Sequence, residues 1–383
     1  MERKDVVCFG GNDWWYHNRN HYEFRLMKEL SNQGTVLYIN SVVLQKPIIS
    51  EGRKFLQKLI RKTKSIIRGL RKTDKGFWVY SPFSLPVHHI SWLRPLNKWI
   101  LQFQIRLITL RLGITNPVIW MAGLPACEVA IKMKRKKLIY QRTDCFEEFP
   151  NIDTKIAKQY DHKIKEVADL VVYANRALQQ RESDSCKKTI YVDHGVDFEL
   201  FSSAEKTPTI PDDLKSINKP IAGFIGQIDD YTVDIEFMEK VVDKMPDWSF
   251  VFIGGTVEDC SSLEKKDNVW MFGKKPYEQV PHYGKCFDVL IMPWKQNDWI
   301  QACNPVKLKE YLALGKPVIS TPFTELQRYQ DVTYAAKTPE EFAESIKTAF
   351  LENSPELVSK RRQKVAHESW ESKIALIHQE IFN

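Results

Sequence analysis

Short, continuously apolar runs alternate along the chain with longer segments whose apolar residues recur at helical spacing. An apolar run without polar alternation is typical of a strand that is buried on both faces, as in a parallel sheet. Strands are therefore expected, in the first half, at 5–9, 35–40, 117–121, 137–141, 170–174 and 189–192. A second series is expected at 221–225, 248–253, 269–272, 289–292 and 318–321. This repeated alternation of strands and helices predicts an α/β fold with parallel sheets.

The alternation restarts after a segment that fits a linker. Residues 202–220 hold two adjacent serines, three prolines and several charges. We predict an N-terminal domain at 1–201, the linker at 202–220 and a second domain at 221–363, with a C-terminal helix at 364–383 that returns to the first domain. A chain of 383 residues suits two domains of ordinary size.

The segment that follows residue 303 carries the marks of a complete helix. Asn304 is a favoured residue for capping a helix start, and Pro305 suits the first helical position. Gly315 fits the left-handed position after the last turn, and Pro317 forbids continuation. The start of such a helix presents backbone amides and a partial positive charge, which together form an anion site.

Two charged residues lie near the start of this helix. Lys307 is in the first turn, and Glu310 follows three residues later on the same face. A cation beside a phosphate, with a carboxylate one turn deeper that accepts two hydroxyl groups, suits a nucleotide diphosphate. The alternative is an ordinary capped surface helix.

Composition and charge narrow the class of protein. Apolar residues make up 43% and charged residues 27% of the chain, which is a globular composition, and the net charge is +8. The seven cysteines are scattered without a CxxC pair, which favours reduced thiols in the cytosol over a zinc or disulfide framework. We expect no signal peptide, no membrane-spanning helix and no metal site. Without an RNA-binding motif, a nucleic-acid partner is not expected either.

Two stretches of the first half combine basic and apolar residues and contain no acid. Residues 53–72 hold nine Lys or Arg, with apolar residues at helical spacing, and residues 91–113 hold four. The pattern predicts a basic amphipathic helix at 53–72, which together with the second stretch contacts an anionic membrane surface. The charges expected to face the lipid are Lys58, Arg61, Lys62 and Arg68. A packed surface helix with a solvated basic face is the alternative interpretation.

A polar and aromatic loop follows the first expected strand. Gly10 and Gly11 form a turn there, and residues 12–21 stand at the carboxyl end of the strand, where open α/β sheets bind ligands. Two adjacent glycines are not a dinucleotide-binding fingerprint, so this loop alone does not identify a ligand.

Four segments, in chain order, resemble the motifs of retaining glycosyltransferases with the GT-B fold. They are His194-Gly195-Val196-Asp197 with Phe201; Ile225-Gly226; Phe272-Gly273 with Tyr277 and Pro281; and the run from Pro305 to Val318. The opening loop, with Arg19 and His21, also looks like the acceptor-side loop of relatives that build bacterial polysaccharides, teichuronic-acid-type transferases included. Each likeness is short, but together they cover nearly the whole chain.

The resemblance implies two Rossmann-like domains that face a cleft, with a nucleotide-sugar donor held mainly by the second. Glu310 would then accept the ribose hydroxyls, the turn at 304–306 would cradle the diphosphate, and Lys307 would neutralise it. The donor-binding residues implied are Gly226, Gln227, Lys274, Asn304, Pro305, Val306, Lys307 and Glu310. The catalytic residues implied are Lys307, Glu310, Asp144 and His21. The donor is a substrate, and no cofactor or metal is implied.

On the acceptor side, the resemblance points to Gly11, Asn12, Trp14, Arg19 and His21. Asp144 joins them because it follows the carboxyl end of the strand expected at 137–141. The alternatives are a helix-capping or solvated role for His21 and a structural cap for Asp144.

Two positions depart from the family pattern. Many relatives carry a second glutamate eight residues before the position of Glu310, and here that residue is Ala302. Many also carry an arginine after the glycine turn and a lysine soon after, whereas the turn at 226–230 here contains no cation. Lys307 is then the cation expected to supply the missing charge.

We therefore expect a metal-independent hexosyltransferase that moves a sugar, with retention, from a nucleotide diphosphate sugar to a saccharide or lipid-linked saccharide. The expected setting is bacterial surface polysaccharide synthesis, in the cytoplasm at the inner face of the plasma membrane. Two alternatives stand beside it: a sugar-nucleotide epimerase of the same architecture, and a non-catalytic partner that binds a nucleotide or glycan. The last alternative stays open because the chain has Ala302 where many relatives have a glutamate.

Overall fold

The computed structural model describes residues 4–16, 22–42, 53–85, 91–148, 152–206, 209–229, 231–257 and 259–382. The chain divides into two compact units, each built on a mainly parallel sheet. The first unit comprises Met1–Asp193 and Ile374–Asn383, and the second comprises His194–Lys373. The α/β fold class with two parallel-sheet domains, which the strand pattern predicted, is confirmed.

The first unit is organised around a sheet whose described strands follow the order β3-β4-β2-β1-β5-β6-β7-β8. Neighbouring strands are parallel except β3 and β4, which are antiparallel. β1, β2, β5 and β7 are buried along their whole length, as expected for strands covered on both faces. The strands are β1 (Val6–Phe9), β2 (Val36–Ile39), β3 (Leu70–Lys72), β4 (Trp78–Tyr80), β5 (Val118–Met121), β6 (Lys137–Arg142), β7 (Leu170–Tyr173) and β8 (Thr189–Tyr191).

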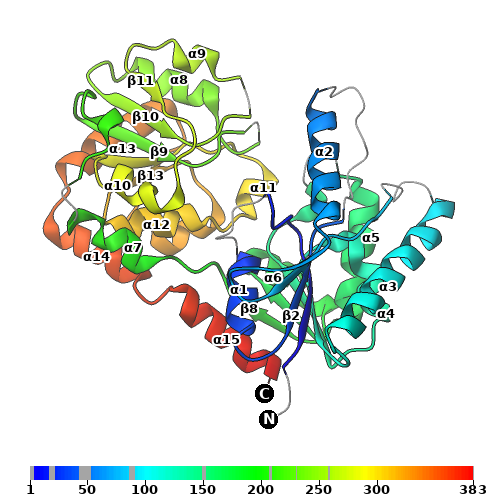
Figure 1. Cartoon of the computed structure of the whole chain (residues 1–383). Helices are drawn as coiled ribbons and strands as arrows, with labels where there is room; N and C mark the ends of the chain where they lie inside the picture. The colour runs from blue at the N-terminus through cyan, green and yellow to red at the C-terminus, as the bar shows by residue number, and fades with distance from the viewer. Residues whose placement is uncertain are drawn as a thin grey trace. The chain divides into compact units, whose positions relative to one another are not determined.

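Helices pack against this sheet. α3 (Arg94–Arg111), α4 (Cys127–Lys132) and α5 (Thr154–Val167) lie in a row on one face, and α1 (Tyr22–Leu30) lies on the opposite face (Figure 1). α6 (Arg176–Glu182) packs against β7 and β8. The last turns of α15 (Trp370–Phe382) are tied to β6, because the Lys137 ammonium donates a 2.8 Å hydrogen bond to the Ile381 carbonyl.

The basic stretch at 53–72 does not form a single helix, contrary to the expectation. α2 (Arg53–Ile67) ends before Gly69, which takes a left-handed conformation with φ of 58°. Leu70 then begins β3, which pairs antiparallel with β4 at the edge of the sheet. Neither α2 nor any other helix of the described residues is long and apolar enough to cross a membrane.

A cluster of buried charges ties α5 and α6 to the end of β6. The fully buried guanidinium of Arg142 makes two hydrogen bonds of 2.9 Å to Glu147 and one of 3.1 Å to Glu182. Lys165 pairs with both Asp161 and Glu182. Burial opposes the charged form of Glu182, but the charges and hydrogen bonds of Arg142 and Lys165 outweigh burial and lower its pKa to about 2.

The second unit holds a sheet whose described strands are all parallel and follow the order β11-β10-β9-β12-β13-β14. The strands are β9 (Ile221–Ile225), β10 (Ser249–Ile253), β11 (Val269–Met271), β12 (Val289–Met292), β13 (Val318–Ser320) and β14 (Tyr334–Ala335). The helices are α7 (Phe198–Ser202), α8 (Ile235–Asp243), α9 (Ser261–Glu264), α10 (Val280–Gly284), α11 (Asp298–Gln301), α12 (Val306–Leu314), α13 (Pro339–Leu351) and α14 (Pro355–Val365).

The segment predicted as a linker, 202–220, carries two short 3-10 helices. Ala204, Leu214 and Ile217 from this segment are buried in the hydrophobic core of the second unit. The described part of the segment therefore packs on that unit and contributes apolar surface to it.

Candidate functional site

The start of α12 organises the candidate site in the second unit. The helix begins at Val306, and Pro305 caps it without a side-chain hydrogen bond. The cap therefore lies one residue later than expected, at Pro305 and not at Asn304. Asn304 is buried beside it. Gly315 ends the helix in the left-handed conformation, with φ of 79°, as predicted. Helix geometry leaves the first amides of α12 without a carbonyl four residues earlier, although the Leu308 amide donates a 3.2 Å hydrogen bond to the Pro305 carbonyl. This end of the helix therefore has the geometry of an anion site.

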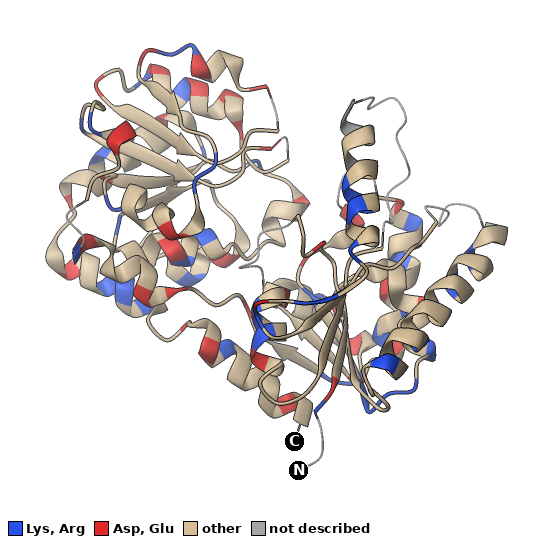
Figure 2. Cartoon of the chain, viewed as in Figure 1, with Lys and Arg blue, Asp and Glu red and all other residues tan. Residues whose placement is uncertain are grey.

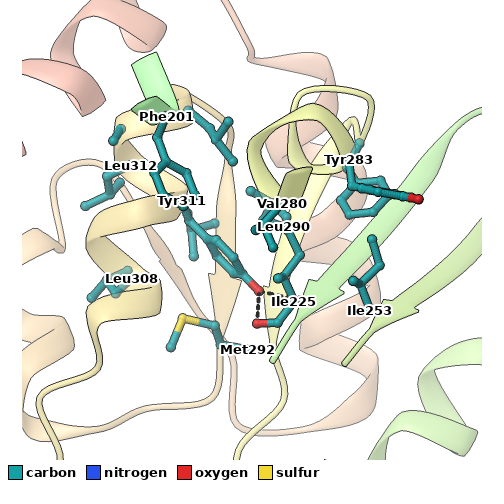
Figure 3. Packing of buried hydrophobic residues seen from close by; sticks show 14 of the residues in the cluster. Phe201, Ile225, Ile253, Val280, Tyr283, Leu290, Met292, Leu308, Tyr311 and Leu312 are labelled. Carbon is teal, nitrogen blue, oxygen red and sulfur yellow. Dashed lines mark hydrogen bonds between the residues drawn. The ribbon is translucent and has the colours of Figure 1, made fainter. Parts of the chain in front are cut away.

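A buried tyrosine on α12 fixes the helix against the sheet. The hydroxyl of Tyr311 accepts a hydrogen bond of 2.7 Å from the amide of Ile225 and donates one of 3.2 Å to the Ile225 carbonyl (Figure 3). In the described pairing, β12 meets β9 at Ala222 and Gly223, before β9 ends. Tyr311 thus takes the place of a neighbouring strand at the end of β9, and it holds the following Gly226 turn against α12.

The first turn of α12 brings Lys307 to this glycine turn. Gly226 has φ of 153°, and a methyl group at this position would overlap the Lys307 ammonium. The ammonium lies 3.9 Å from the centre of the Phe224 ring and 5.7 Å from that of Trp294, so both rings stabilise the cation. Gln227, the next residue of the turn, is exposed. The turn has no cation in its own sequence, and the fold supplies one from α12.

The surroundings of Lys307 weaken its hold on the proton. Desolvation lowers the pKa of Lys307 to about 8, although the negative charges of Glu310 and Asp229 oppose the change. The ammonium is therefore charged at neutral pH and titrates in mildly alkaline solution. A bound anion would stabilise its charged form.

A second lysine lies over the neighbouring glycine turn. Gly254 and Gly255 follow β10, and the amide of Ile228 donates a 2.9 Å hydrogen bond to the carbonyl of Gly255. A methyl group at Gly255 would overlap the side chain of Lys274. Lysines from two distant parts of the sequence thus lie against the glycine turns after β9 and β10.

Glu310 lies one turn deeper than Lys307 and faces a tyrosine. The Tyr277 hydroxyl lies 2.9 Å from a carboxylate oxygen of Glu310 and 2.9 Å from one of Asp197. Burial and the charges of these two carboxylates raise the pKa of Tyr277, so the phenol keeps its proton. Because a phenol has one proton, it donates to one of the two carboxylates at a time.

Three residues of this site received no role from the sequence. Tyr277 stood in a recognised motif, but nothing in the pattern indicated that its hydroxyl reaches Glu310. Tyr311 stood in the recognised run from Pro305 to Val318 and Phe224 in the strand expected at 221–225, and both are buried. The polar or cation contacts of these three residues join segments far apart in the sequence, so no local sequence pattern predicts these contacts.

In the first unit, a buried carboxylate holds the loop after β1. Glu23, on α1, accepts hydrogen bonds from the amide of Gly11 at 3.0 Å and from the side chain of Asn12 at 2.9 Å. The Tyr38 hydroxyl donates to the same carboxylate at 2.6 Å. Gly11 and Asn12 therefore stand at the carboxyl end of β1 with the Asn12 amide group engaged in supporting the loop.

Trp14, also predicted on the acceptor side, lies in the core of the first unit. It is 1% exposed and packs edge-on against Phe24 and Phe77, with ring centres 4.9 and 5.0 Å away. Its ring therefore supports the loop from the core side and does not form the loop's surface. Arg19 and His21 lie outside the described residues.

Asp144 follows the carboxyl end of β6, where the sequence placed it. Burial raises the pKa of its carboxyl group, and the hydrogen bond with Thr143 and the charge of Arg142 only partly offset that rise. β6 is two strands from β1 in the sheet order. Because parallel strands end at the same edge of a sheet, Asp144 and the loop after β1 share that edge.

The basic residues of α2 do not all face solvent. Lys62 donates a 2.7 Å hydrogen bond to a carbonyl just after β2, and the Arg68 guanidinium lies 4.7 Å from the centre of the Trp15 ring. Arg61 is exposed, and the side chain of Lys58 lies outside the described part of the structure. Lys62, and Arg68 directly after α2, thus contact segments that follow β2 and β1 at one edge of the sheet of the first unit.

The second unit matches a known family. Residues 219–352 match the family model described as Glycosyl transferases group 1. The matched range includes the glycine turns, Lys274, Tyr277 and the whole of α12. The second unit therefore contains a domain of this family, as the motifs predicted.

The chain is also similar to a curated protein of Bacillus subtilis (strain 168). It is 32% identical over 184 residues to TuaH, which is named for a glycosyltransferase role in teichuronic acid biosynthesis. The match spans 46% of this chain and 46% of TuaH, so it covers about half the length of that relative.

Solved structures share the fold over nearly the whole chain. Sucrose-phosphate synthase from Thermosynechococcus elongatus aligns with a TM-score of 0.73 at 14% identity, covering 99% of this chain and 98% of that one. HepE of Anabaena in complex with UDP aligns with a TM-score of 0.68 at 13% identity, covering 99% of both chains. At such identities the likeness establishes the fold, which is the predicted GT-B fold, and not the activity.

Proposed function

We propose that this chain, whose second unit contains a glycosyl transferases group 1 domain, transfers a sugar from a nucleotide diphosphate sugar to a saccharide or lipid-linked saccharide acceptor. The observation that carries the proposal is the Lys307 ammonium lying against the Gly226 turn, beside the first turn of α12. Helix amides, a cation and a glycine that admits close approach of the backbone together suit a diphosphate.

In this proposal the nucleoside half of the donor is held by Glu310. Its carboxylate accepts the ribose hydroxyls, and the Tyr277 hydroxyl then donates to Asp197, which already lies within 2.9 Å. Complexes of HepE with UDP and with UDP-glucose are formed on the same fold. They support uridine diphosphate sugars among the first donors to test.

The leaving diphosphate gains negative charge as its bond to the sugar breaks. Lys307 and the amides of the first turn of α12 stabilise that charge, which is the largest contribution a fixed site makes to such a transfer. The leaving phosphate oxygen takes the proton of the acceptor hydroxyl, which attacks from the same face of the sugar, so the configuration is retained. Lys307 carries the charge that a metal ion would otherwise supply, and the reaction is metal-independent.

The acceptor is assigned to the loop after β1 and to Asp144, which share one edge of the first unit's sheet. Gly11 exposes its backbone there, and burial raises the pKa of the Asp144 carboxyl. The basic residues of α2 next to this loop favour an acceptor carried on an anionic membrane. The setting that we propose is the inner face of the plasma membrane, in surface polysaccharide synthesis.

The proposal is tested by incubating the protein and its Lys307→Met variant with UDP-, GDP- and dTDP-sugars, with and without EDTA. The wild type is expected to release nucleotide from at least one donor, unaffected by EDTA, and NMR of the product is expected to show a retained anomeric configuration.

The alternative functions give other products. Conversion of the donor sugar without an acceptor would identify an epimerase. Glycan binding without turnover of any donor would identify a non-catalytic partner. This alternative is considered because Ala302 stands where many relatives have a glutamate. Inversion, or loss of activity in EDTA, would contradict the proposed chemistry.

A further inference from the structure

The outer side of α3 is apolar and exposed, although its inner side is already packed. The inner, buried side consists of Asn97, Leu101, Ile105 and Thr109. The outer side carries five apolar residues that are 49% to 65% exposed: Leu96, Trp99, Phe103, Leu107 and Leu110. Residues two positions apart lie about 200° apart around a helix, so the outer stripe is opposite the packed side.

α2 likewise directs apolar residues outward. Its inner side is polar: the Ser65 hydroxyl donates a 2.7 Å hydrogen bond to Asp13, and Lys62 reaches a backbone carbonyl after β2. Its outer side holds four apolar residues that are 44% to 77% exposed: Leu56, Leu59, Ile60 and Ile67. A surface helix normally directs its apolar stripe toward the core. The alternative of a packed helix with a solvated basic face therefore does not describe α2.

The charged residues of the two stretches that carry these stripes are all basic, although Lys98 of α3 pairs with Glu128 of α4 at 3.4 Å. The stretches 53–72 and 91–113 contain nine and four Lys or Arg and no Asp or Glu. Figure 2 accordingly shows no acidic residue on α3. On α3, Arg106 and Arg111 are exposed beside the apolar stripe. Docking a second copy of this chain on the same faces would bring two positive surfaces together, whereas an anionic lipid surface complements them.

We propose that the outward faces of α2 and α3 dock the first unit on an anionic lipid bilayer. The apolar side chains enter the boundary between headgroups and acyl chains, and the exposed residues Arg61, Arg106 and Arg111 meet the lipid phosphates. Trp92 and Trp99 suit this depth, because an indole has an apolar ring and a polar N–H group. The occupant of the two stripes is thus a lipid surface.

The docking surface is joined to the acceptor-side loop. Ser65 of α2 hydrogen-bonds Asp13, and Arg68 lies over the rings of Trp15 and Tyr16. A membrane bound by α2 would therefore meet the loop that the proposed function assigns to the acceptor. The inference deepens that function by naming the surface that faces a lipid-linked acceptor, and it rests on that function for the acceptor alone.

Vesicle sedimentation tests the surface without any donor sugar. The wild type is compared with a Leu59→Gln, Trp99→Gln, Phe103→Gln variant, whose changes are exposed and spare the core. A Val257→Gln, Leu351→Gln variant is the matched control, because these apolar residues are 60% and 81% exposed in the second unit. On phosphatidylglycerol-rich vesicles the triple variant is expected to bind at least about tenfold more weakly, with the control unchanged. Equal binding of the triple variant and the wild type would overturn the proposal.

Tryptophan quenching reports whether the stripes enter the lipid. Among the eleven tryptophans, Trp92 and Trp99 are the exposed ones, at 76% and 62%. Brominated acyl chains are expected to quench the wild type and to quench a Trp92→Phe, Trp99→Phe variant much less. Equal quenching would overturn insertion at α3.

Light scattering of the lipid-free protein examines the other occupant. A dimeric wild type with a monomeric triple variant would assign the stripes to a second copy of the chain and overturn the lipid proposal. A monomeric wild type would support the lipid proposal. Failure of vesicle binding leaves nucleotide release from the donor unaffected, so the two proposals fail separately.

Discussion

The Tyr311 hydroxyl completes the hydrogen bonding of Ile225, the last residue of β9, by accepting from its amide at 2.7 Å and donating to its carbonyl at 3.2 Å. Gly226 follows Ile225 directly, and Lys307 lies one turn before Tyr311 on α12. This side chain therefore sets the separation between the glycine turn and the cation of the proposed diphosphate site.

Removing that hydroxyl should loosen the site as well as the fold. Tyr311→Phe leaves a buried amide and carbonyl without partners, so the free energy of unfolding in urea should fall by about 1–3 kcal/mol. Calorimetry should also show weaker binding of nucleoside diphosphates. Tyr334→Phe is the control, because its hydroxyl makes an exposed hydrogen bond to Glu352. Unchanged stability and affinity in Tyr311→Phe would show that the Tyr311 hydroxyl does not hold the glycine turn against α12.

Donor binding should weaken as the solution becomes alkaline. The pKa of Lys307 is lowered to about 8, so its ammonium is charged below that pH and loses its proton above it. Dissociation constants for nucleoside diphosphates should therefore rise between pH 7 and pH 9. Lys307→Met should weaken binding at pH 7 by about tenfold or more and abolish this rise, because the charge is absent throughout. A variant that keeps the wild-type pH profile would show that another group titrates.

The Gly226 turn should not tolerate a side chain. Gly226→Ala combines φ of 153° with overlap of the new methyl group and the Lys307 ammonium. Gly273→Ala is the matched control: its φ of 63° is also positive, but no atom lies within 4 Å of the added methyl group. Both variants should lose some stability. Diphosphate affinity should fall only in Gly226→Ala, and an equal fall in both would point to backbone strain alone.

The buried charges of the first unit should be costly to disrupt. Arg142→Ala leaves Glu147 and Glu182 without their main partner, so the free energy of unfolding should fall by about 3–5 kcal/mol. Arg181 also contacts Glu182, but its side chain is 61% exposed, and Arg181→Ala should cost about 1 kcal/mol or less. Urea denaturation measures both. Similar losses in the two variants would contradict the assignment of the network to Arg142.

The strands of the two sheets could be predicted because strands covered on both faces are continuously apolar. β1 and β2 lie inside the ranges expected for them. Three strands were missed, β3, β4 and β14, and none of them is buried along its whole length. β3 contains Arg71 and Lys72 and pairs antiparallel at the edge, and β14 has two residues. The helix predicted at 53–72 from its helical spacing therefore extended beyond Ile67, where α2 ends.

The candidate site divides in the same way between local and long-range information. Lys307 and Glu310 could be placed together because they lie three residues apart on one helix. Lys307 contacts Gly226, and Glu310 contacts Tyr277, across segments that are distant in sequence. Only the fold brings these segments together. The burial of Trp14 was missed for a related reason, because a polar and aromatic loop does not reveal which of its rings enters the core.

The central claim is that α12 binds the donor through Glu310 at the ribose and Lys307 at the diphosphate. Titration calorimetry with ribonucleoside diphosphates and their 2′-deoxy counterparts tests it most directly, in the wild type and in Glu310→Ala. We predict that the wild type prefers the ribonucleotide, and that Glu310→Ala binds it about tenfold or more weakly and loses the preference. Wild-type affinity and unchanged preference in Glu310→Ala would contradict the account.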